Sequence, residues 1–171
     1  GGSQDPEGKE GLAHYLEHVV FTAVPGKTEA EFKGEVTSRG GTRNGSTNTV
    51  RTRYWLEVPA SEWGFALNWM DQLLFDKTFD EENIVRQRDP ILLEGKAAMK
   101  PKGPMDYLED LVSMKGVGPP GFSERELGIP YKVRPVLGTW ESLHRIKPED
   151  LSAFYERYYG PQNMLLTVVG D

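Results

Sequence analysis

Two of the chain's three histidines lie four residues apart, with a glutamate between them, in the stretch HYLEH at 14–18. Spacings of three and four residues place His14, Glu17 and His18 on one face of a helix, with their Cβ atoms close enough to converge. Two imidazoles one helical turn apart suit zinc, which binds histidine with Zn–N bonds of about 2.0–2.1 Å. Glu17 is then placed to act on a zinc-activated water rather than to bind the metal. The pattern predicts hydrolysis of the peptidase type, and it requires a third metal ligand from elsewhere.

The order H-x-x-E-H is the inverted form of the H-E-x-x-H motif of zinc peptidases. Because short motifs also occur by chance, an alternative is a pair of surface histidines on an amphipathic helix. The chain contains no cysteine, which excludes thiolate ligands and disulfides. Any metal held here must therefore be bound through nitrogen and oxygen atoms.

Length and composition place this motif in an ordinary globular domain. The chain has 171 residues, of which 37% are hydrophobic and 27% charged, a balance that allows one domain with its own core. The formal net charge of −6 argues against a nucleic-acid partner or an anionic membrane surface, since both attract clustered basic residues. No apolar run approaches the roughly 18–20 residues that a membrane span needs. We expect neither nucleic acid nor membrane as a partner.

Three elements are predicted in and after the motif. Apolar residues at helical spacing predict a helix over 10–22. Thr28 and Glu31 have the spacing of a capping box and predict a second helix over 28–39. The segment 42–58 is rich in threonine, valine and aromatic residues and predicts one or two strands, whose polar part suits the edge of a sheet.

The rest of the chain is predicted to be mainly helical and to end in a strand. Asp80 is the expected cap of a long helix, in which Pro90 removes a backbone donor and should introduce a kink. The apolar stretch at 163–171 predicts a strand buried on both faces. The other predicted elements are helices over 61–75, 81–99, 104–114, 139–145 and 148–159 and an irregular segment over 115–135. This order fits a single α+β domain over 1–171, with two layers and the helices packed on one face of a mainly antiparallel sheet.

The motif and its flanks, EGLAHYLEHVVF, resemble the signature of the M16 family of zinc metallopeptidases almost residue for residue. In that family the third zinc ligand is a glutamate on a long helix further along the chain, in a stretch like E-R-D-x-I-x-x-E. The stretch QRDPILLE ends at Glu94, which the resemblance therefore implies as the third ligand. It further implies one Zn²⁺ per chain, bound by His14, His18 and Glu94, with Glu17 as the catalytic base.

A second resemblance lies in GGTRNGSTNTVRTRY at 40–54, where family members usually read G-G-x-x-N-A-x-T-x-x-D-x-T-x-Y. In the family an extended substrate adds to this edge strand beside the metal. An edge strand suits that role because its unpaired N–H and C=O groups recognise peptide backbone whatever the side chains are. The end of the chain, YYGPQNMLLTVVGD, is similar to a strand near the end of the family's first α/β repeat. The residues implied in substrate binding are Asn44, Gly45, Ser46 and Thr47.

Three positions depart from the family pattern. Gln87 stands on the same helix face as Glu94, where the family commonly has a glutamate that supports the site without binding the metal. Its loss is expected to weaken metal binding or to alter activity. Val50 replaces a usual aspartate, and Pro90 stands where a helix-compatible residue is common. None of these changes removes a ligand or the base.

Family members also contain a strand before this region and a related second half that closes a chamber around the substrate. The resemblance therefore implies a first catalytic domain, expected to be a fragment lacking both. Its expected partners are a peptide or unfolded polypeptide substrate and a related second-half domain, in the same chain or in a separate subunit. Because a missing first strand would expose a sheet edge, we expect self-association into homo-oligomers. The compartment is open, with the bacterial periplasm or cytoplasm favoured over an organelle.

Two other functions are compatible with parts of the sequence. A non-catalytic relative would bind peptide or a partner protein as a structural component; Gln87 favours this alternative, whereas the intact ligands and base favour an enzyme. A small-molecule zinc hydrolase would share the inverted motif but would leave the edge-strand segment unexplained. The favoured hypothesis is a zinc-dependent endopeptidase domain that acts on extended peptides through a metal-activated water.

Overall fold

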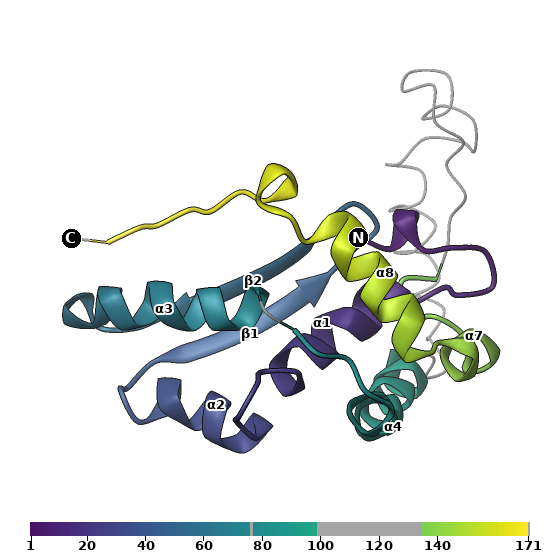
Figure 1. The fold of residues 1–171 in the computed structure, drawn as a ribbon, viewed down its shortest axis with the longest axis horizontal. Coiled ribbons are helices and arrows are strands. Elements are labelled where there is room, and N and C mark those ends of the chain that lie inside the picture. Colours follow the sequence, from purple (N-terminus) through teal and green to yellow (C-terminus); the bar gives the residue numbers. More distant parts are fainter. Residues whose placement is uncertain (76, 99–134, 171) are drawn as a thin grey trace, which may run out of the picture.

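The computed structural model describes residues 1–75, 77–98 and 135–170 (Figure 1). Single 3₁₀ turns lie at Gly2–Gln4, Ala60–Glu62 and Pro161–Asn163. The helices are α1 (Leu12–Thr22), α2 (Glu29–Thr37), α3 (Trp63–Leu74), α4 (Glu81–Ala98), α7 (Trp140–Arg145) and α8 (Pro148–Tyr158), and the strands are β1 (Thr42–Thr47) and β2 (Thr52–Glu57). In Figure 1, α2 and α3 lie to the left of α1, and α4, α7 and α8 lie to its right.

The predicted α+β class is confirmed, and the described helices and hairpin strands match their predicted positions except for a few residues at their ends. Asp80 caps α4 as predicted, since its Oδ1 accepts the backbone N–H of Asn83 at 2.8 Å. Helix α4 continues through Pro90. The predicted helix over 104–114 and nearly all of the irregular segment over 115–135 lie outside the described residues.

Helix α1 forms the core of the domain. Every residue of α1 except His18 is buried, and Tyr15, Leu16 and Val19 are completely so. The helix contacts α2, α3, α4, α8 and both strands. A helix that is buried around nearly its whole circumference depends on the surrounding core for its stability. The polar side chains that α1 carries are therefore held in place by packing from several elements at once.

A buried carboxylate caps the start of α1 from a loop outside the helix. Asp5 Oδ2 accepts the N–H of Gly11 at 2.8 Å, and Oδ1 accepts the N–H of Ala13 at 2.9 Å. Gly11 has a left-handed backbone with φ of 91°, and a Cβ at this position would lie 2.7 Å from the Cα of Gly138. Glycine is therefore required there, and Asp5 supplies the acceptors for two of the helix's free N–H groups.

Strands β1 and β2 form an antiparallel hairpin in which Gly45 pairs with Tyr54 and Thr47 pairs with Thr52. At the turn the N–H of Asn48 donates to the carbonyl of Arg51 at 3.0 Å. Hydrogen-bonded and non-hydrogen-bonded pairs alternate along an antiparallel ladder, so the backbone groups of Gly45 and Thr47 point away from β2. In the described part of the chain the sheet has two strands. The outer edge of β1 is thus not paired with another described strand.

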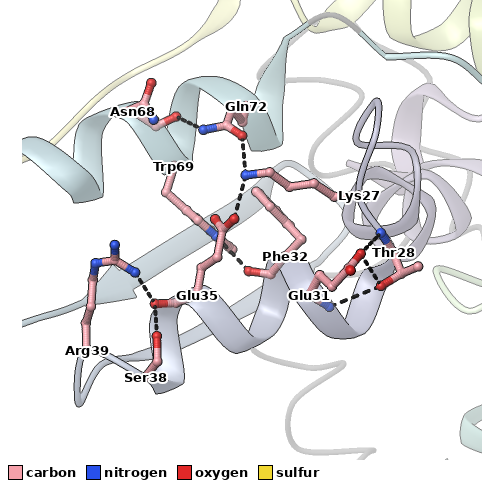
Figure 2. Close-up of polar contacts among 10 residues, drawn as sticks. All are labelled: Lys27, Thr28, Glu31, Phe32, Glu35, Ser38, Arg39, Asn68, Trp69 and Gln72. Carbon is pink, nitrogen blue, oxygen red and sulfur yellow. Dashed lines mark hydrogen bonds and ion pairs between the residues drawn. The ribbon is translucent and has the colours of Figure 1, made fainter.

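Figure 2 shows how α2 is joined to α3. The Lys27 ammonium donates to Glu35 Oε1 at 2.6 Å and to Gln72 Oε1 at 2.8 Å. Beside this cluster the indole N–H of Trp69 donates to the carbonyl of Phe32 at 3.0 Å, and the two rings stack with their centroids 4.4 Å apart. These contacts bind α2 to the helix that packs beside the hairpin.

The capping box predicted at the start of α2 is confirmed. The Thr28 hydroxyl accepts the N–H of Glu31 at 3.2 Å, and Glu31 Oε2 accepts the N–H of Thr28 at 2.8 Å (Figure 2). The reciprocal pair satisfies two backbone donors at the helix N-terminus. It fixes where α2 begins.

The prediction of a buried strand over 163–171 is wrong for the described residues. Residues 164–170 have no regular secondary structure, and they run outward from the rest of the molecule in Figure 1. Leu165 and Val169 are each 92% exposed. An apolar segment becomes a strand only when a neighbouring strand supplies hydrogen-bond partners, and no described strand lies beside this one.

The described helices include none that is both long enough and apolar enough to cross a lipid bilayer.

We predict that Asp5→Ala lowers the free energy of unfolding by about 2–3 kcal/mol, because two N–H groups at the buried start of α1 lose their acceptors. Urea denaturation monitored by circular dichroism measures this change. Asp71→Ala is the matched control: its carboxylate is exposed on α3, and its removal should cost no more than about 0.5 kcal/mol. Equal effects of the two substitutions would contradict the capping role.

Candidate metal centre

The structure brings His14 and His18 together on the side of α1 that faces α4. Their Nε2 atoms lie 3.3 Å apart. His14 is buried with 6% of its surface exposed, whereas His18 is half-buried. The helical spacing of four residues alone produces this approach, and the surrounding core holds it.

Glu94, predicted as the third ligand, reaches the same point from α4. Its Oε2 lies 3.4 Å from His14 Nε2 and 3.5 Å from His18 Nε2. In the described residues, this is the one group of three or more His, Asp or Glu side chains found to converge in a way that suits a metal ion. Ligands about 2.0–2.1 Å from a tetrahedral zinc lie about 3.3–3.4 Å from one another. The three observed separations therefore match three corners of a zinc coordination tetrahedron.

Both imidazoles are held in the neutral form that binds metals. Burial, and then the neighbouring His18, lower the pKa of His14 to about 4. Burial also lowers the pKa of His18, although the charge of Glu94 acts in the opposite direction. At neutral pH the site therefore presents two nitrogen lone pairs and a carboxylate to one another rather than an ion pair. A cation is the group that stabilises such an arrangement.

Glu17, the predicted base, is buried beside this group, but its carboxylate is not among the converging donor atoms. Its Oε2 accepts the hydroxyl of Thr47 at 2.6 Å. Its other oxygen lies against Gly45, where a Cβ would approach Oε1 to 2.7 Å. Burial raises the pKa of Glu17, and the Thr47 hydrogen bond partly opposes that shift. The carboxylate is thus fixed by β1 and has an increased affinity for a proton.

The four strand residues predicted to bind substrate divide into two pairs. Gly45 and Thr47 are half-buried and contact Glu17. Asn44 and Ser46 are exposed, and Asn44 Oδ1 accepts the N–H of Gly45 at 2.9 Å. Their role in substrate binding stays a prediction. The contact between Thr47 and Glu17 was missed, although the period of two along a strand already places Gly45 and Thr47 on one face.

Further hydroxyl groups extend behind Thr47 into the hairpin. The hydroxyls of Thr47 and Thr52 lie 3.1 Å apart, and those of Tyr54 and Tyr159 lie 2.7 Å apart. Thr52 also acts on Tyr159, in the direction that lowers the pKa of its hydroxyl. Burial raises the pKa of both tyrosines, and the charge of Glu17 adds to this. Sequence reasoning missed Tyr159, which follows α8, because nothing local to it points to a contact with β2.

Gln87 lies buried on α4, as its predicted supporting role requires. Its Nε2 donates to Glu29 Oε2 at 3.1 Å. The Gln87 side chain also acts on His18, in the direction that raises the pKa of its imidazole. Glu29, in the first turn of α2, was not predicted as part of the site, because its distance in the sequence from the other residues carries no signal.

The sequence and the site together define the class of this protein. The family model described as insulinase, peptidase family M16, matches residues 1–118. The chain therefore belongs to the M16 family of peptidases.

Named relatives and solved structures agree with this family assignment. The chain is 28% identical over 161 residues to an uncharacterized zinc protease, YmxG, of Bacillus subtilis, covering 94% of this chain and 36% of the relative. It is 28% identical over 160 residues to a probable mitochondrial-processing peptidase subunit beta of Arabidopsis thaliana, covering 94% of this chain and 28% of the relative. The chain spans about a third of the length of the curated relatives that it matches.

The fold is also that of solved proteases. A protease from Helicobacter pylori superposes with a TM-score of 0.73 at 22% identity, covering 95% of this chain and 37% of that chain. Pitrilysin superposes with a TM-score of 0.67 at 26% identity, covering 93% of this chain and 16% of that chain.

The low pKa of His14 predicts a pH dependence of stability in the metal-free chain. In the unfolded chain His14 takes up a proton as the pH falls below its ordinary pKa of about 6.5. In the folded chain His14 takes up this proton only near pH 4. The contribution of His14 to stability is therefore fully present above about pH 6.5 and is lost progressively as the pH falls below it. We expect His14 to account for a loss of roughly 2 kcal/mol between pH 7 and pH 5.

Urea denaturation at the two pH values, with chelator present, measures this loss. His14→Gln should reduce the loss, and His144→Gln, which changes an exposed histidine on α7, should leave it unchanged. A pH dependence in His14→Gln equal to that of the wild type would contradict the assignment.

Proposed function

We propose that this chain is the zinc-binding domain of an endopeptidase that hydrolyses extended peptides through an activated water. The observation that carries the proposal is the convergence of three donor atoms, from His14, His18 and Glu94, at separations of 3.3–3.5 Å. The peptidase family of the chain and the zinc protease names of its relatives support the same function. One Zn²⁺ per chain is the proposed cofactor.

The proposed reaction assigns the proton transfers to Glu17. Zinc, when bound by the three ligands, supplies Lewis-acid chemistry that acidifies a water and polarises a carbonyl. Glu17 takes the proton that the water loses as it attacks the scissile carbonyl, and then passes that proton to the leaving amine. The Thr47 hydroxyl holds Oε2 of this carboxylate during both transfers. Because its pKa is raised, the Glu17 carboxylate can keep the proton until it passes to the leaving amine.

The proposed substrate site is the outer edge of β1. The backbone groups of Gly45 and Thr47 point to this edge, and an extended peptide would pair with them as an added strand. Asn44 Oδ1 presently accepts the Gly45 N–H, so that this side chain has to turn away before the N–H can bind substrate. Asn44 and Ser46 complete the proposed peptide site.

The proposed partners beyond the substrate follow from the length of the relatives. Because the chain spans about a third of them, we propose that a related second-half domain, in the same chain or in another subunit, completes the enzyme. The exposed apolar residues of 164–170, and the edge of β1 that pairs with no described strand, make self-association the alternative for the chain alone. A non-catalytic, peptide-binding subunit is the competing function, and metal content and turnover distinguish it from the enzyme.

We predict about one zinc per chain after dialysis against a weak chelator, and loss of that zinc in Glu94→Ala. Removing Glu94 leaves two neutral nitrogen ligands, too few for a stable site. Atomic absorption on the purified chain gives the stoichiometry. His144→Ala is the control, since its imidazole is exposed on α7. Zinc retained in Glu94→Ala, or absent from the wild type, would overturn the ligand set.

We predict that Glu17→Gln keeps its zinc but lowers kcat on an unstructured peptide by roughly 10²–10⁴-fold, the usual contribution of a general base. The amide fills nearly the same space but cannot accept the proton. Glu141→Gln, an exposed residue of α7, is the control and should match the wild type. Full turnover by zinc-loaded Glu17→Gln would exclude the base assignment. Zinc binding without turnover, in the wild type joined to its second-half domain, would favour the non-catalytic subunit.

A further inference from the structure

The threonine that contacts Glu17 is itself contacted by a second threonine across the hairpin. Thr47 of β1 is paired with Thr52 of β2. Because the backbone groups of Thr47 point away from β2, the two form a non-hydrogen-bonded pair, in which the Cα atoms lie only about 4.5 Å apart and the side chains come closest. Their Oγ1 atoms are 3.1 Å apart, and Thr47 Oγ1 is also 2.6 Å from Glu17 Oε2. The Thr47 oxygen is thus held from two sides.

The chemistry of these groups fixes the direction of both hydrogen bonds. An ionised carboxylate can only accept, and a hydroxyl has one hydrogen to donate. Thr47 gives its hydrogen to Glu17, so the hydrogen in the contact between the threonines has to come from Thr52. If the Thr52 hydrogen were directed at Tyr159 instead, the two threonine oxygens would face each other at 3.1 Å without a hydrogen between them. The direction therefore runs from Thr52 to Thr47 to Glu17.

The turn between the strands keeps the two threonines opposite each other. Asn48 and Arg51 directly adjoin Thr47 and Thr52, and the N–H of Asn48 donates to the carbonyl of Arg51 at 3.0 Å. The side chain of Asn48 closes the same turn, since its Oδ1 accepts the N–H groups of Val50 and Arg51, each at 2.9 Å. In a hairpin the turn sets the register of the strands. Thr52 is therefore held in place by backbone contacts that do not involve Glu17.

Thr52 reaches the carboxylate of Glu17 only by way of Thr47. In the described part of the chain it makes no hydrogen bond to Glu17 and is not among the converging metal-binding residues. It also lies on β2, so that β1 stands between it and the proposed substrate edge. A hydroxyl that accepts a hydrogen bond becomes a stronger donor, and one held at both ends has a fixed orientation.

We propose that Thr52 is a positioning residue of the catalytic base: its hydroxyl donates to Thr47 Oγ1 and fixes the Thr47 hydroxyl in the orientation that holds Glu17. The inference rests on the proposed function and extends the catalytic arrangement from β1 to β2. Thr52 contacts neither the substrate nor the metal ligands in this arrangement. Its effect is transmitted through one hydroxyl group.

Thr52→Val tests the proposal in the zinc-loaded enzyme with its second-half domain, because valine keeps the branched shape but has no hydroxyl. We expect kcat on an unstructured peptide to fall roughly tenfold, since a less well oriented base transfers protons less efficiently. KM should stay within about twofold of the wild type, because binding of the substrate is unaffected. Thr52→Ser restores the donor and should return kcat to within about threefold. Equal losses in the valine and serine variants would overturn the proposal.

A double-mutant cycle shows whether Thr52 acts through Thr47. Thr47→Val removes the hydrogen bond to Glu17 and should lower kcat at least as far as Thr52→Val does. Adding Thr52→Val to Thr47→Val should lower kcat by less than a further factor of about two, because no Thr47 hydroxyl is left to orient. Thr37→Val makes the same change at an exposed residue of α2 and should match the wild type. Independent effects of the two hairpin substitutions would contradict the proposed path.

A second measurement decides the role of Thr52 without zinc or turnover. Three-bond couplings from Cγ2 of Thr47 to its backbone nitrogen and carbonyl carbon report its side-chain rotamer in the metal-free chain. We expect one rotamer in the wild type and in Thr52→Ser, and averaging between rotamers in Thr52→Val. A single, unchanged rotamer in Thr52→Val would refute the role of Thr52. Absence of turnover in the wild-type enzyme would refute the proposed function, and the Thr47 rotamer would still decide the role of Thr52.

Discussion

The burial of α1 is the constraint on which the rest of the structure depends. Ten of its eleven residues are buried, so most polar groups that the helix carries are cut off from bulk water and gain stability from partners within the protein. Asp5 supplies such partners at the helix start, Thr47 supplies one for Glu17, and the carbonyl of Ile84 supplies one for the Tyr15 hydroxyl. These three partners come from a loop, a strand and another helix. Polar contacts as well as apolar packing therefore join α1 to the elements around it.

The same burial sets the chemistry of the site. Desolvation disfavours charge, and it therefore lowers the pKa of His14 and His18 and raises that of Glu17. Neutral imidazoles are the form that binds metals, and a carboxylate with a raised pKa is a better proton acceptor. One physical cause produces both properties in residues one to three positions apart. Burial is the largest cause of the pKa shift in each of the three residues.

Sequence reasoning succeeded where the relation between residues is local or follows a known pattern. The pairing of His14 and His18 depends only on helical spacing, and the capping box of Thr28 and Glu31 depends only on one turn of chain. Glu94 was found by its position in the family pattern, since no local rule relates α4 to α1. The buried strand over 163–171 was predicted wrongly because hydrophobicity alone does not supply a neighbouring strand. Glu29 was missed because its hydrogen bond with Gln87 joins two residues 58 positions apart, on α2 and α4, and no local rule relates them.

Strand β1 contacts the proposed base with its side chains and presents its backbone to the proposed substrate. Side chains of a strand stand perpendicular to the sheet, whereas the N–H and C=O groups lie within it. Gly45 and Thr47 therefore face Glu17 on one side, while their backbone groups point to the edge that pairs with no described strand. Gly45 allows the carboxylate to approach the strand because it has no Cβ, and Thr47 then binds that carboxylate. Gly45 and Thr47 would therefore bind the peptide backbone and contact Glu17 at the same time. The position of the substrate relative to the base would be set by these two residues.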